Sequence, residues 1–535
     1  MDYLSLCLIC KDENDYLPEW LDYHILTGVE RFYIYDNESR VGLRKTLAEY
    51  IERGWVVVVD IPGKAMQLQA YDHCLQTFGP NTFWLGFIDT DEFLVPKTTL
   101  DLKEFLKNYE PYGGLVVSSL FFGSNSHVER PDAGQIASYT LRTHATFKEN
   151  ELVKSIVQPA RVLMPNSPHD FTYKENSWAV NENFLRAGNQ RFPCYTEKIQ
   201  LNHYYCRSES EIELKQRRGN SGAVVWSRKG FNKVNIMSAY PDTQCLQNLE
   251  RLFQKAGLST GGVLEKMAAL AHARRPSLLD MVPPRMVLGV RAEFKELADI
   301  KDQIELVRST SDYNQVCDLL LKMTPMQPGY ADVYVDLAMN YMNIFDPDSA
   351  WRALSQAWRL APNTYAVLTG MAYFFLWVKN FPMAEKTSRL LLDIAPHNLH
   401  ALGLLTSALI EQERFDEALK IGVPVLELSA QLGELPARMS FFLVKKMSDH
   451  LLEKKDYQGA IFLWRAGVMC LPDDINPLLE LASAMILAGD KTSAQQVLLQ
   501  VQVLAPQNER LPVLLKQAAA TDLRWTRGTH KRKRH

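Results

Sequence analysis

Two aspartates separated by one residue follow an apolar stretch early in the chain. The stretch 83–88 ends in Asp89-Thr90-Asp91. Carboxylate oxygens are the ligands that Mg²⁺ and Mn²⁺ prefer, and such a cation can bridge diphosphate oxygens and stabilise the charge that develops when a bond to phosphate breaks. We therefore expect Asp89 and Asp91 to hold Mn²⁺ or Mg²⁺. The alternative is a pair of strand-end caps, because this spacing also occurs by chance.

The elements that would position these aspartates alternate between strand and helix patterns. Four apolar runs predict strands, at 3–10, 31–35, 55–59 and 83–88. Three segments between them have helical spacing, at 16–27, 43–51 and 65–78. This alternation predicts a parallel, doubly wound, Rossmann-like α/β sheet, in which ligands bind at the carboxyl ends of the strands. A polar residue follows every predicted strand, at Asp12, Asp36, Asp60 and Asp89.

The residues after this region have a different pattern. Between 100 and 240, predicted strands such as Gly114–Leu120 and Ser155–Val162 mix with long polar loops. Loops of this kind often carry binding functions, so we interpret this half as the acceptor side of a site. Residues 246–327 predict amphipathic helices broken at Pro276 and Pro283-Pro284, and we interpret them as a connector.

Beyond residue 327 the chain repeats. Prolines recur at one constant spacing, at Pro328, Pro362 and Pro396 and again at Pro472 and Pro506, and an alanine keeps one phase in every unit, at Ala350, Ala384, Ala418, Ala460 and Ala494. An insertion at 431–438 interrupts the period, and the third unit closes on Ala430 in place of proline. A period of about 34 residues with a small residue at the helix contact resembles the tetratricopeptide repeat, which stacks into an all-α superhelix with a concave binding surface.

Composition narrows the class of protein. A chain of 535 residues predicts more than one domain, and its net charge of −3 gives no reason to expect nucleic-acid binding. No apolar run is long enough to predict a transmembrane segment. The eight scattered cysteines indicate a reducing cytoplasm. Cys7 and Cys10 form a C-x-x-C, but at this separation on a strand they face opposite ways, so we expect buried cysteines and no zinc site.

The segment 1–225 resembles glycosyltransferase family 92 and its bacterial relatives, which have the GT-A type of fold. The motifs that carry the resemblance are Glu19–His24, Gly28–Asn37, Gln67-x-x-Ala70-Tyr71-x-His73-Cys74, Trp84–Phe93, Phe122-Gly123-Ser124 with His127, Lys154–Val157 with Pro159, Asn202-His203-Tyr204 and Ser208-x-x-Glu211-x-x-x-Lys215-x-x-Arg218-Gly219. The resemblance implies a metal-dependent enzyme that moves a sugar, expected to be a hexose, from a nucleotide-sugar donor to a glycan, lipid-linked glycan or other hydroxyl acceptor, with inversion.

The resemblance also implies roles for individual residues. Asp89 would face the donor ribose and the metal, Asp91 would face the metal and the diphosphate, and His203 would be the third metal ligand. The other candidates for donor binding are Lys11, Glu13, Asp36, Asn37, Gln67, Lys215 and Arg218. Each has an ordinary alternative as a turn residue or part of a solvated basic face. Gln67 and His73 fall on different faces of one helix, so we expect at most one to reach the donor.

An inverting transfer needs a base for the acceptor hydroxyl. The candidates in the acceptor-side loops are His127, Glu129 and Asp132, with His169 and Asp170 further along. The sequence does not choose among them. Glu92 follows the metal pair but could point into the fold.

The predicted organisation is a GT-A type domain at 1–245, a helical connector at 246–327, a repeat array at 328–515 and a basic tail at 516–535. We expect the repeats to hold an acceptor, a partner protein or a second copy of the chain. We expect the protein in the cytoplasm, with a peripheral place at the inner face of a membrane left open. Two alternatives remain: a repeat scaffold with an inactive glycosyltransferase-like domain, and a nucleotidyltransferase, against which stands Lys11-Asp12-Glu13-Asn14 where a glycine-rich phosphate loop would lie.

Overall fold

The computed structural model describes the chain except for residues 189, 219–227, 257–291, 328, 433–434 and 520–535. It separates into two compact units. The first contains Met1–Val378 with Asp393–Pro396, and the second contains Lys379–Leu392 with His397–His535. The candidate site lies entirely in the first unit.

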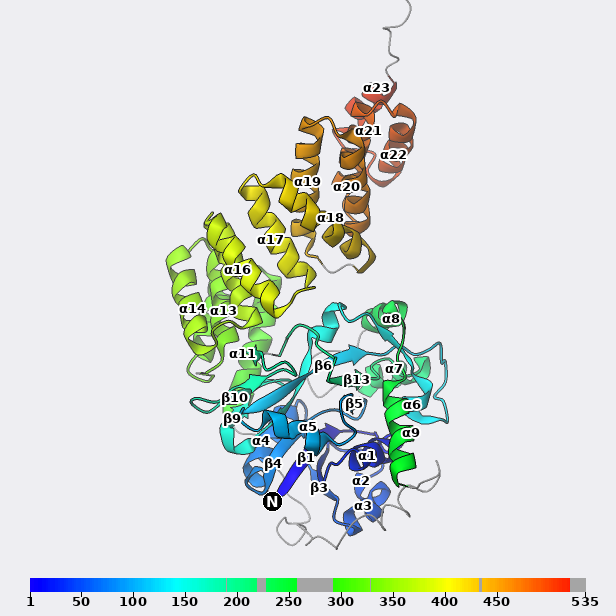
Figure 1. The fold of residues 1–535 in the computed structure, drawn as a ribbon, viewed down its shortest axis with the longest axis vertical. Helices are drawn as coiled ribbons and strands as arrows, with labels where there is room; N and C mark the ends of the chain where they lie inside the picture. Colours follow the sequence, from blue (N-terminus) through cyan, green and yellow to red (C-terminus); the bar gives the residue numbers. More distant parts are fainter. Residues whose placement is uncertain (189, 219–227, 257–291, 328, 433–434, 520–535) are drawn as a thin grey trace, which may run out of the picture. The chain divides into compact units, whose positions relative to one another are not determined.

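The first unit is built on a mixed sheet in the order β12 (Arg186–Ala187), β11 (Ala179–Val180), β6 (Gly114–Phe121), β8 (Val153–Val157), β4, β1, β2 and β3. Figure 1 labels β6, β4, β1 and β3 of this sheet. The four predicted strands are present and parallel, as β1 (Asp2–Cys10), β2 (Arg31–Asp36), β3 (Val56–Asp60) and β4 (Thr82–Phe87). Cys10 pairs in register with Asp36, which pairs with Asp60, so the carboxyl ends of these strands lie along one edge. This confirms the predicted α/β class.

Helices cover both faces of this sheet because the strand side chains alternate between two buried cores. Leu4, Leu6 and Leu8 belong to the core that also holds residues of α1 (Leu17–Leu26) and α3 (Ala48–Glu52), whereas Cys7 and Ile9 belong to the core under α4 (Gln67–Thr77). Cys10 lies in the first core and Cys7 in the second. Both cysteines are buried, as predicted.

One predicted helix and one predicted strand are each two separate elements in the structure. The helix predicted at 43–51 is two short helices, α2 (Leu43–Thr46) and α3, which meet at Leu47. The strand predicted at 155–162 is β8 (Val153–Val157) and β9 (Val162–Pro165), separated by a 3₁₀ turn at Pro159–Arg161. Proline has no N–H to give to a neighbouring strand, so the ladder stops where Pro159 enters.

Four later strands complete the edge that carries the site. β8 is antiparallel to both β4 and β6 (Gly114–Phe121). β13 (Ile199–His203) lies between β6, to which it is parallel, and β5 (Glu92–Pro96), to which it is antiparallel. In this register His203 is opposite both Glu92 and Phe121, which brings a residue remote in sequence next to the acidic triplet.

Helices of the predicted connector also belong to the first unit. α9 (Gln244–Ala256) is tied to the sheet by Asn248, whose Nδ2 donates to Pro96 O at 2.7 Å. α11 (Ala292–Ser309) is held to the residue that follows β9 by Lys301, whose Nζ donates to Asn166 O at 3.0 Å. The prolines at 276, 283 and 284 lie outside the described residues. The first unit further includes α12 (Tyr313–Met323), α13 (Ala331–Asn343), α14 (Pro347–Leu360) and α15 (Tyr365–Trp377).

The second unit is all-helical. Its helices are α16 (Phe381–Ile394), α17 (Leu399–Glu411), α18 (Phe415–Leu432), α19 (Ala437–Glu453), α20 (Tyr457–Cys470), α21 (Asn476–Leu487), α22 (Lys491–Leu504) and α23 (Leu511–Ala519). The alanines that recur through both units, Ala350, Ala384, Ala418, Ala460 and Ala494, are all fully buried, as the repeat pattern requires. α18 continues to Leu432 because Ala430 stands where other repeats have the proline that ends this helix.

Across the helices that the structure describes, none is long and apolar enough to cross a membrane.

Candidate active site

A cleft of about 740 Å³ opens where β1, β2 and β4 end. Its walls come from several separate segments between Ile9 and Val234. Carboxylates on the walls are Glu13, Glu38, Asp89, Asp91, Glu92 and Glu149. Cations on the walls are Lys11, Lys64, Lys154, Lys215 and Lys233, and two histidines join them, His169 and His203. Charges of both signs therefore face a space large enough for a small-molecule ligand.

The acidic triplet sits in a turn between β4 and β5 whose backbone is held from several sides. Asp89 N donates to Glu92 Oε2 at 2.9 Å, and Tyr204 N donates to Asp91 O at 2.8 Å. Trp20 of α1 donates its indole N–H to Glu92 O at 2.9 Å. These bonds fix the direction of the two aspartate side chains.

Asp91 lies between a lysine and a histidine. Lys215 Nζ donates to Asp91 Oδ2 at 2.8 Å, and His203 Nε2 lies 3.7 Å from Asp91 Oδ1. Burial alone would raise the pKa of Asp91, but Lys215 and His203 hold it well below its usual range. Burial lowers the pKa of His203 to about 4, against the opposing pull of Asp91. At neutral pH the pair is therefore a carboxylate beside a neutral imidazole.

A second ion pair holds Asp89. Lys154 Nζ donates to Asp89 Oδ2 at 2.7 Å and lies 3.3 Å from Glu92 Oε2. Gln67 Nε2 approaches Asp89 Oδ1 at 3.4 Å. Burial raises the pKa of Glu92 to about 8, and Lys154 only partly offsets this. The Asp89 side chain keeps 34% of its exposure, whereas that of Glu92 keeps 2%. Both carboxylates lie on the cleft wall, but Asp89 is open to the cleft, whereas Glu92 is buried and supports the turn.

The donor set suits a divalent cation that shares its ligands with a substrate. Asp91 supplies a carboxylate and His203 a neutral nitrogen, both on the cleft wall. In the described part of the chain, no three His, Cys, Asp or Glu side chains converge into a complete metal cage. Mg²⁺ and Mn²⁺ commonly take one or two protein ligands and complete their shell with phosphate oxygens and water, so the two donors fit such an ion.

Lys215 is placed by the start of α7 (Glu209–Arg218). Glu211 accepts from Ser208 N at 3.1 Å and from Ser208 Oγ at 2.6 Å, and the first of these bonds is the glutamate half of a capping box. Tyr16 OH also donates to Glu211 and ties the helix to the loop after β1. Arg218 ends α7, but its side chain lies outside the described residues.

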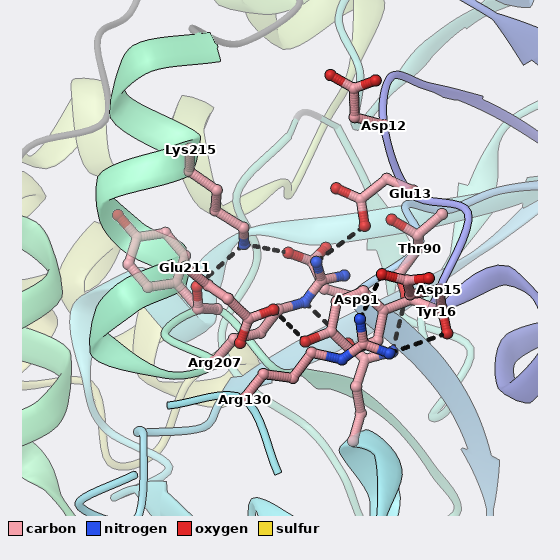
Figure 2. A network of polar contacts seen from close by, with 12 residues as sticks. Asp12, Glu13, Asp15, Tyr16, Thr90, Asp91, Arg130, Arg207, Glu211 and Lys215 are labelled. Carbon is pink, nitrogen blue, oxygen red and sulfur yellow. Dashed lines mark hydrogen bonds and ion pairs between the residues drawn. The ribbon is translucent and has the colours of Figure 1, made fainter. Parts of the chain in front are cut away.

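Arg207, which the sequence did not single out, lies near Glu13, Tyr16 and Asp91 (Figure 2). Its Nη1 donates to Glu13 Oε2 at 2.8 Å, its Nε donates to Gln135 Oε1 at 3.0 Å, and its guanidinium stacks 3.8 Å from the centre of the Tyr16 ring. Its side chain keeps only 3% of its exposure. In the sequence, Arg207 lies between His203, a candidate metal ligand, and the Ser208-x-x-Glu211 motif. This position between two recognised motifs was the signal that could have identified it.

Only some of the candidates for nucleoside binding line the cleft. Lys11, Glu13, Asn37 and Gln67 line the cleft, and His73 of the same helix as Gln67 does not appear among its described walls. Asn37 uses its Nδ2 on Ile61 O and Gly63 O, at 2.7 and 2.9 Å. Asp36 is buried, and its carboxylate accepts from Ser39 N and Leu43 N at 2.9 and 3.2 Å. Asp36 therefore organises the loop that presents Asn37.

The candidate bases His127, Glu129 and Asp132 lie in a loop that contributes nothing to the described walls of the cleft. Glu129 and Asp132 are exposed, and His127 packs edge-on against Tyr139. His169 does line the cleft, whereas its neighbour Asp170 is buried outside it.

The segment that forms the cleft is similar to a known protein family. The model of glycosyltransferase family 92 matches residues 3–237, which include every described wall of the cleft. A family 92 protein of Oryza sativa subsp. japonica is 31% identical over 184 residues, covering 33% of this chain and 31% of its own length. One of Ricinus communis is 30% identical over 185 residues, covering 33% of each chain. The predicted resemblance is thus confirmed for the first domain, and the chain spans about a third of the length of these relatives.

Among solved structures, two similar chains are described as pilF of Pseudomonas aeruginosa and as PilW, a widely conserved type IV pilus biogenesis factor. They are each 15% identical, cover 42% of this chain and all of their own, and have TM-scores of 0.34 and 0.35. We draw nothing from likenesses of this size.

Proposed function

We propose that the first domain is a GT-A type glycosyltransferase that uses Mn²⁺ or Mg²⁺ to transfer a hexose, with inversion, from a nucleotide sugar to a hydroxyl of a glycan or lipid-linked glycan. The observation that carries this proposal is the pair formed by Asp91 and His203 beside Asp89, at the strand ends of a domain that matches glycosyltransferase family 92.

Asp91 and His203 would hold the cation, and Asp89 would face the donor from the opposite side of the turn. The cation, when bound, stabilises the charge that appears on the leaving diphosphate. Lys215 and Lys154 add fixed positive charge within reach of the same aspartates. Buried charges of this kind act strongly because water does not screen them. Asn37, Lys11 and Gln67, on the wall near β2 and α4, would contact the nucleoside.

An inactive scaffold is the weaker alternative. Lys154 and Lys215 keep 2% and 5% of their side-chain exposure beside carboxylates on a cleft wall. Burying such charges is costly, and ion pairs do not repay that cost when the only purpose is stability. Their presence at an open cleft supports a site that binds charged ligands.

The repeats are proposed to bind a partner, with three candidates: the acceptor, another protein, or a second copy of the chain. Their recurring buried residues are small and serve helix packing. This leaves the outward surfaces of the helices for binding, as in other solenoids.

The decisive experiment measures release of nucleoside diphosphate from a panel of sugar nucleotides with Mn²⁺. Asp91→Asn should abolish release and transfer, and chelator should abolish both in the unaltered protein. Asp60→Asn is the matched control, because Asp60 also ends a strand at this edge but pairs at 3.5 Å with Arg44 and is not among the cleft walls. Full activity of Asp91→Asn would refute the proposal.

A further inference from the structure

We propose that His169 is the general base of this transfer: its Nε2 takes the proton of the acceptor hydroxyl. The inference rests on the proposed function and adds to it the identity of a catalytic residue that the acceptor-side loops of the sequence left open.

His169 is held against the strand that carries Lys154. It lies in the turn between β9 and β10 (Phe171–Tyr173) and lines the cleft together with Lys154 and His203. Its main-chain oxygen accepts from Ser155 Oγ at 2.6 Å, and its N–H donates to Ser167 Oγ at 3.1 Å. The residue is therefore fixed in place before any substrate arrives.

The ring contact defines which nitrogen is basic. His169 Nδ1 lies 2.9 Å from the carbonyl oxygen of Val153. A carbonyl can only accept a hydrogen bond, so Nδ1 carries the hydrogen and Nε2 carries the lone pair. A carbonyl behind one nitrogen and a lone pair on the other is the arrangement that lets an imidazole accept a proton.

The carboxylates on the described walls of the cleft are less suited to this role. Asp89 is paired with Lys154, and Asp91 is paired with Lys215. Glu92 has a raised pKa, but its side chain keeps only 2% of its exposure and its Oε2 accepts from Asp89 N, so an acceptor hydroxyl does not reach it. The other two pairs on the walls are Glu13 with Arg207 and Glu149 with Lys233. A paired carboxylate is a weaker base because its cation stabilises the ionised form. Glu38, which accepts from Gly63 N at 3.2 Å, lies on the nucleoside side beside Asn37.

In the absence of a donor, the surroundings of His169 keep its ring unprotonated. Burial, helped by Lys154, lowers the pKa of His169 to about 3, so the ring is neutral at neutral pH. A bound donor brings a diphosphate into the same cleft. Its negative charge raises the affinity of a nearby imidazole for a proton, so basicity increases when the donor is present.

The step balances without any further reactant. The acceptor oxygen attacks the anomeric carbon from the face opposite the leaving group and forms the new C–O bond. The bond between the anomeric carbon and the phosphate oxygen breaks, and its electron pair leaves with the nucleoside diphosphate. The hydroxyl proton moves to Nε2, which gives an imidazolium that later releases the proton to water.

The test compares His169→Asn with His144→Asn. Asparagine places an amide N–H close to the position of Nδ1, so the bond to Val153 can persist while Nε2 is removed. His144 is the control because it is also a half-buried histidine of the acceptor-side region, with Nδ1 2.8 Å from Thr146 Oγ1, and it is not among the described walls of the cleft.

We expect His169→Asn to reduce transfer to a hydroxyl acceptor by about 10²- to 10⁴-fold, the usual contribution of a general base, while donor affinity stays within about twofold. Azide carries no proton to remove, so formation of the glycosyl azide should remain near the rate of the unaltered protein. His144→Asn should behave as the unaltered protein in all three measurements.

Three results would overturn the assignment: hydroxyl transfer within about threefold of the unaltered protein, loss of donor binding in proportion to the loss of transfer, or equal loss of the azide reaction. If His169→Asn does not fold, His169→Gln is measured in the same way, since glutamine is another uncharged amide at this position. Failure of the unaltered protein to transfer from any donor would refute the proposed function, and that outcome is separate because it does not depend on the variants.

Discussion

The buried pair between Arg207 and Glu13 gives the sharpest test of how this site is stabilised (Figure 2). Their side chains keep 3% and 6% of their exposure. Removing one partner of such a pair leaves the other charge buried without compensation, which costs about 3–5 kcal/mol. Arg207→Met removes the positive charge but keeps the aliphatic part that packs on Tyr16.

Arg207→Met and Glu13→Gln should lower the free energy of unfolding by different amounts. After Arg207→Met, Glu13 stays buried and loses the ion pair with Nη1 of Arg207, so we expect a cost of about 3–5 kcal/mol. After Glu13→Gln, Arg207 still has Asp91 and Glu211 nearby, which stabilise its positive charge. We therefore expect the smaller loss, about 1–2 kcal/mol, for Glu13→Gln. The double variant should be more stable than Arg207→Met alone, with a coupling of about 2 kcal/mol.

Hydrogen exchange of peptides from β1 and β4 is the appropriate assay, because it reports the free energy of opening of the first unit without contribution from the second. Arg130→Met is the control, since Arg130 pairs with Asp15 but its side chain keeps 41% of its exposure. Its loss should cost no more than about 1 kcal/mol. Equal losses for Arg207→Met and Arg130→Met, or a coupling below about 0.5 kcal/mol, would refute the reasoning.

Three further predictions follow from single residues. His203→Ala should weaken Mn²⁺ binding in the presence of a nucleoside diphosphate by about 10-fold or more, measured by calorimetry; unchanged affinity would remove it from the ligand set. His24 is fully buried and its burial lowers its pKa to about 3, so the folded state stays neutral while an unfolded histidine takes a proton below about pH 6.5. Stability should therefore fall with pH below 6.5, by about 2 kcal/mol at pH 5 for this residue, and His24→Gln should show a correspondingly smaller difference between pH 7 and pH 5 in urea unfolding. Ala460→Leu should destabilise the second unit by about 1–3 kcal/mol through overpacking, with donor affinity of the first unit unchanged in a binding titration.

The sequence predicted the part of the site that depends on local order. Apolar strands that end in aspartate, in a regular alternation with helices, were sufficient to place Asp89 and Asp91 at a strand-end cleft. The repeat phase was equally informative, because a fully buried alanine in each unit repeats the same helix contact. Ala430, which replaces the closing proline of the third unit, lies inside α18, which runs on to Leu432.

Arg207 and Lys154 could not be assigned in the same way, because their roles depend on residues remote in sequence. Lys154 belonged to a recognised motif, but nothing local shows that β8 inserts between β4 and β6 and brings it to Asp89. The strand predicted at 155–162 hid this arrangement, since it missed the break at Pro159 that ends β8 and lets the chain return through β9. Periodicity detects the faces of an element but not its neighbours in a sheet.

The choice of base also depends on contacts that the sequence does not reveal. His127, Glu129 and Asp132 are candidates because they are polar residues in a polar loop, but the exposure of Glu129 and Asp132 is what a solvated loop produces without any function. His169 has the opposite character: its backbone and ring are bound to β8, and its neighbour Asp170 is buried away from the cleft. Catalysis requires a group held at one place relative to the substrate, because positioning before the reaction removes an entropic cost from it. A polar residue tied by both backbone and side chain to the strand beside the metal candidates meets that requirement, whereas chemical type alone does not.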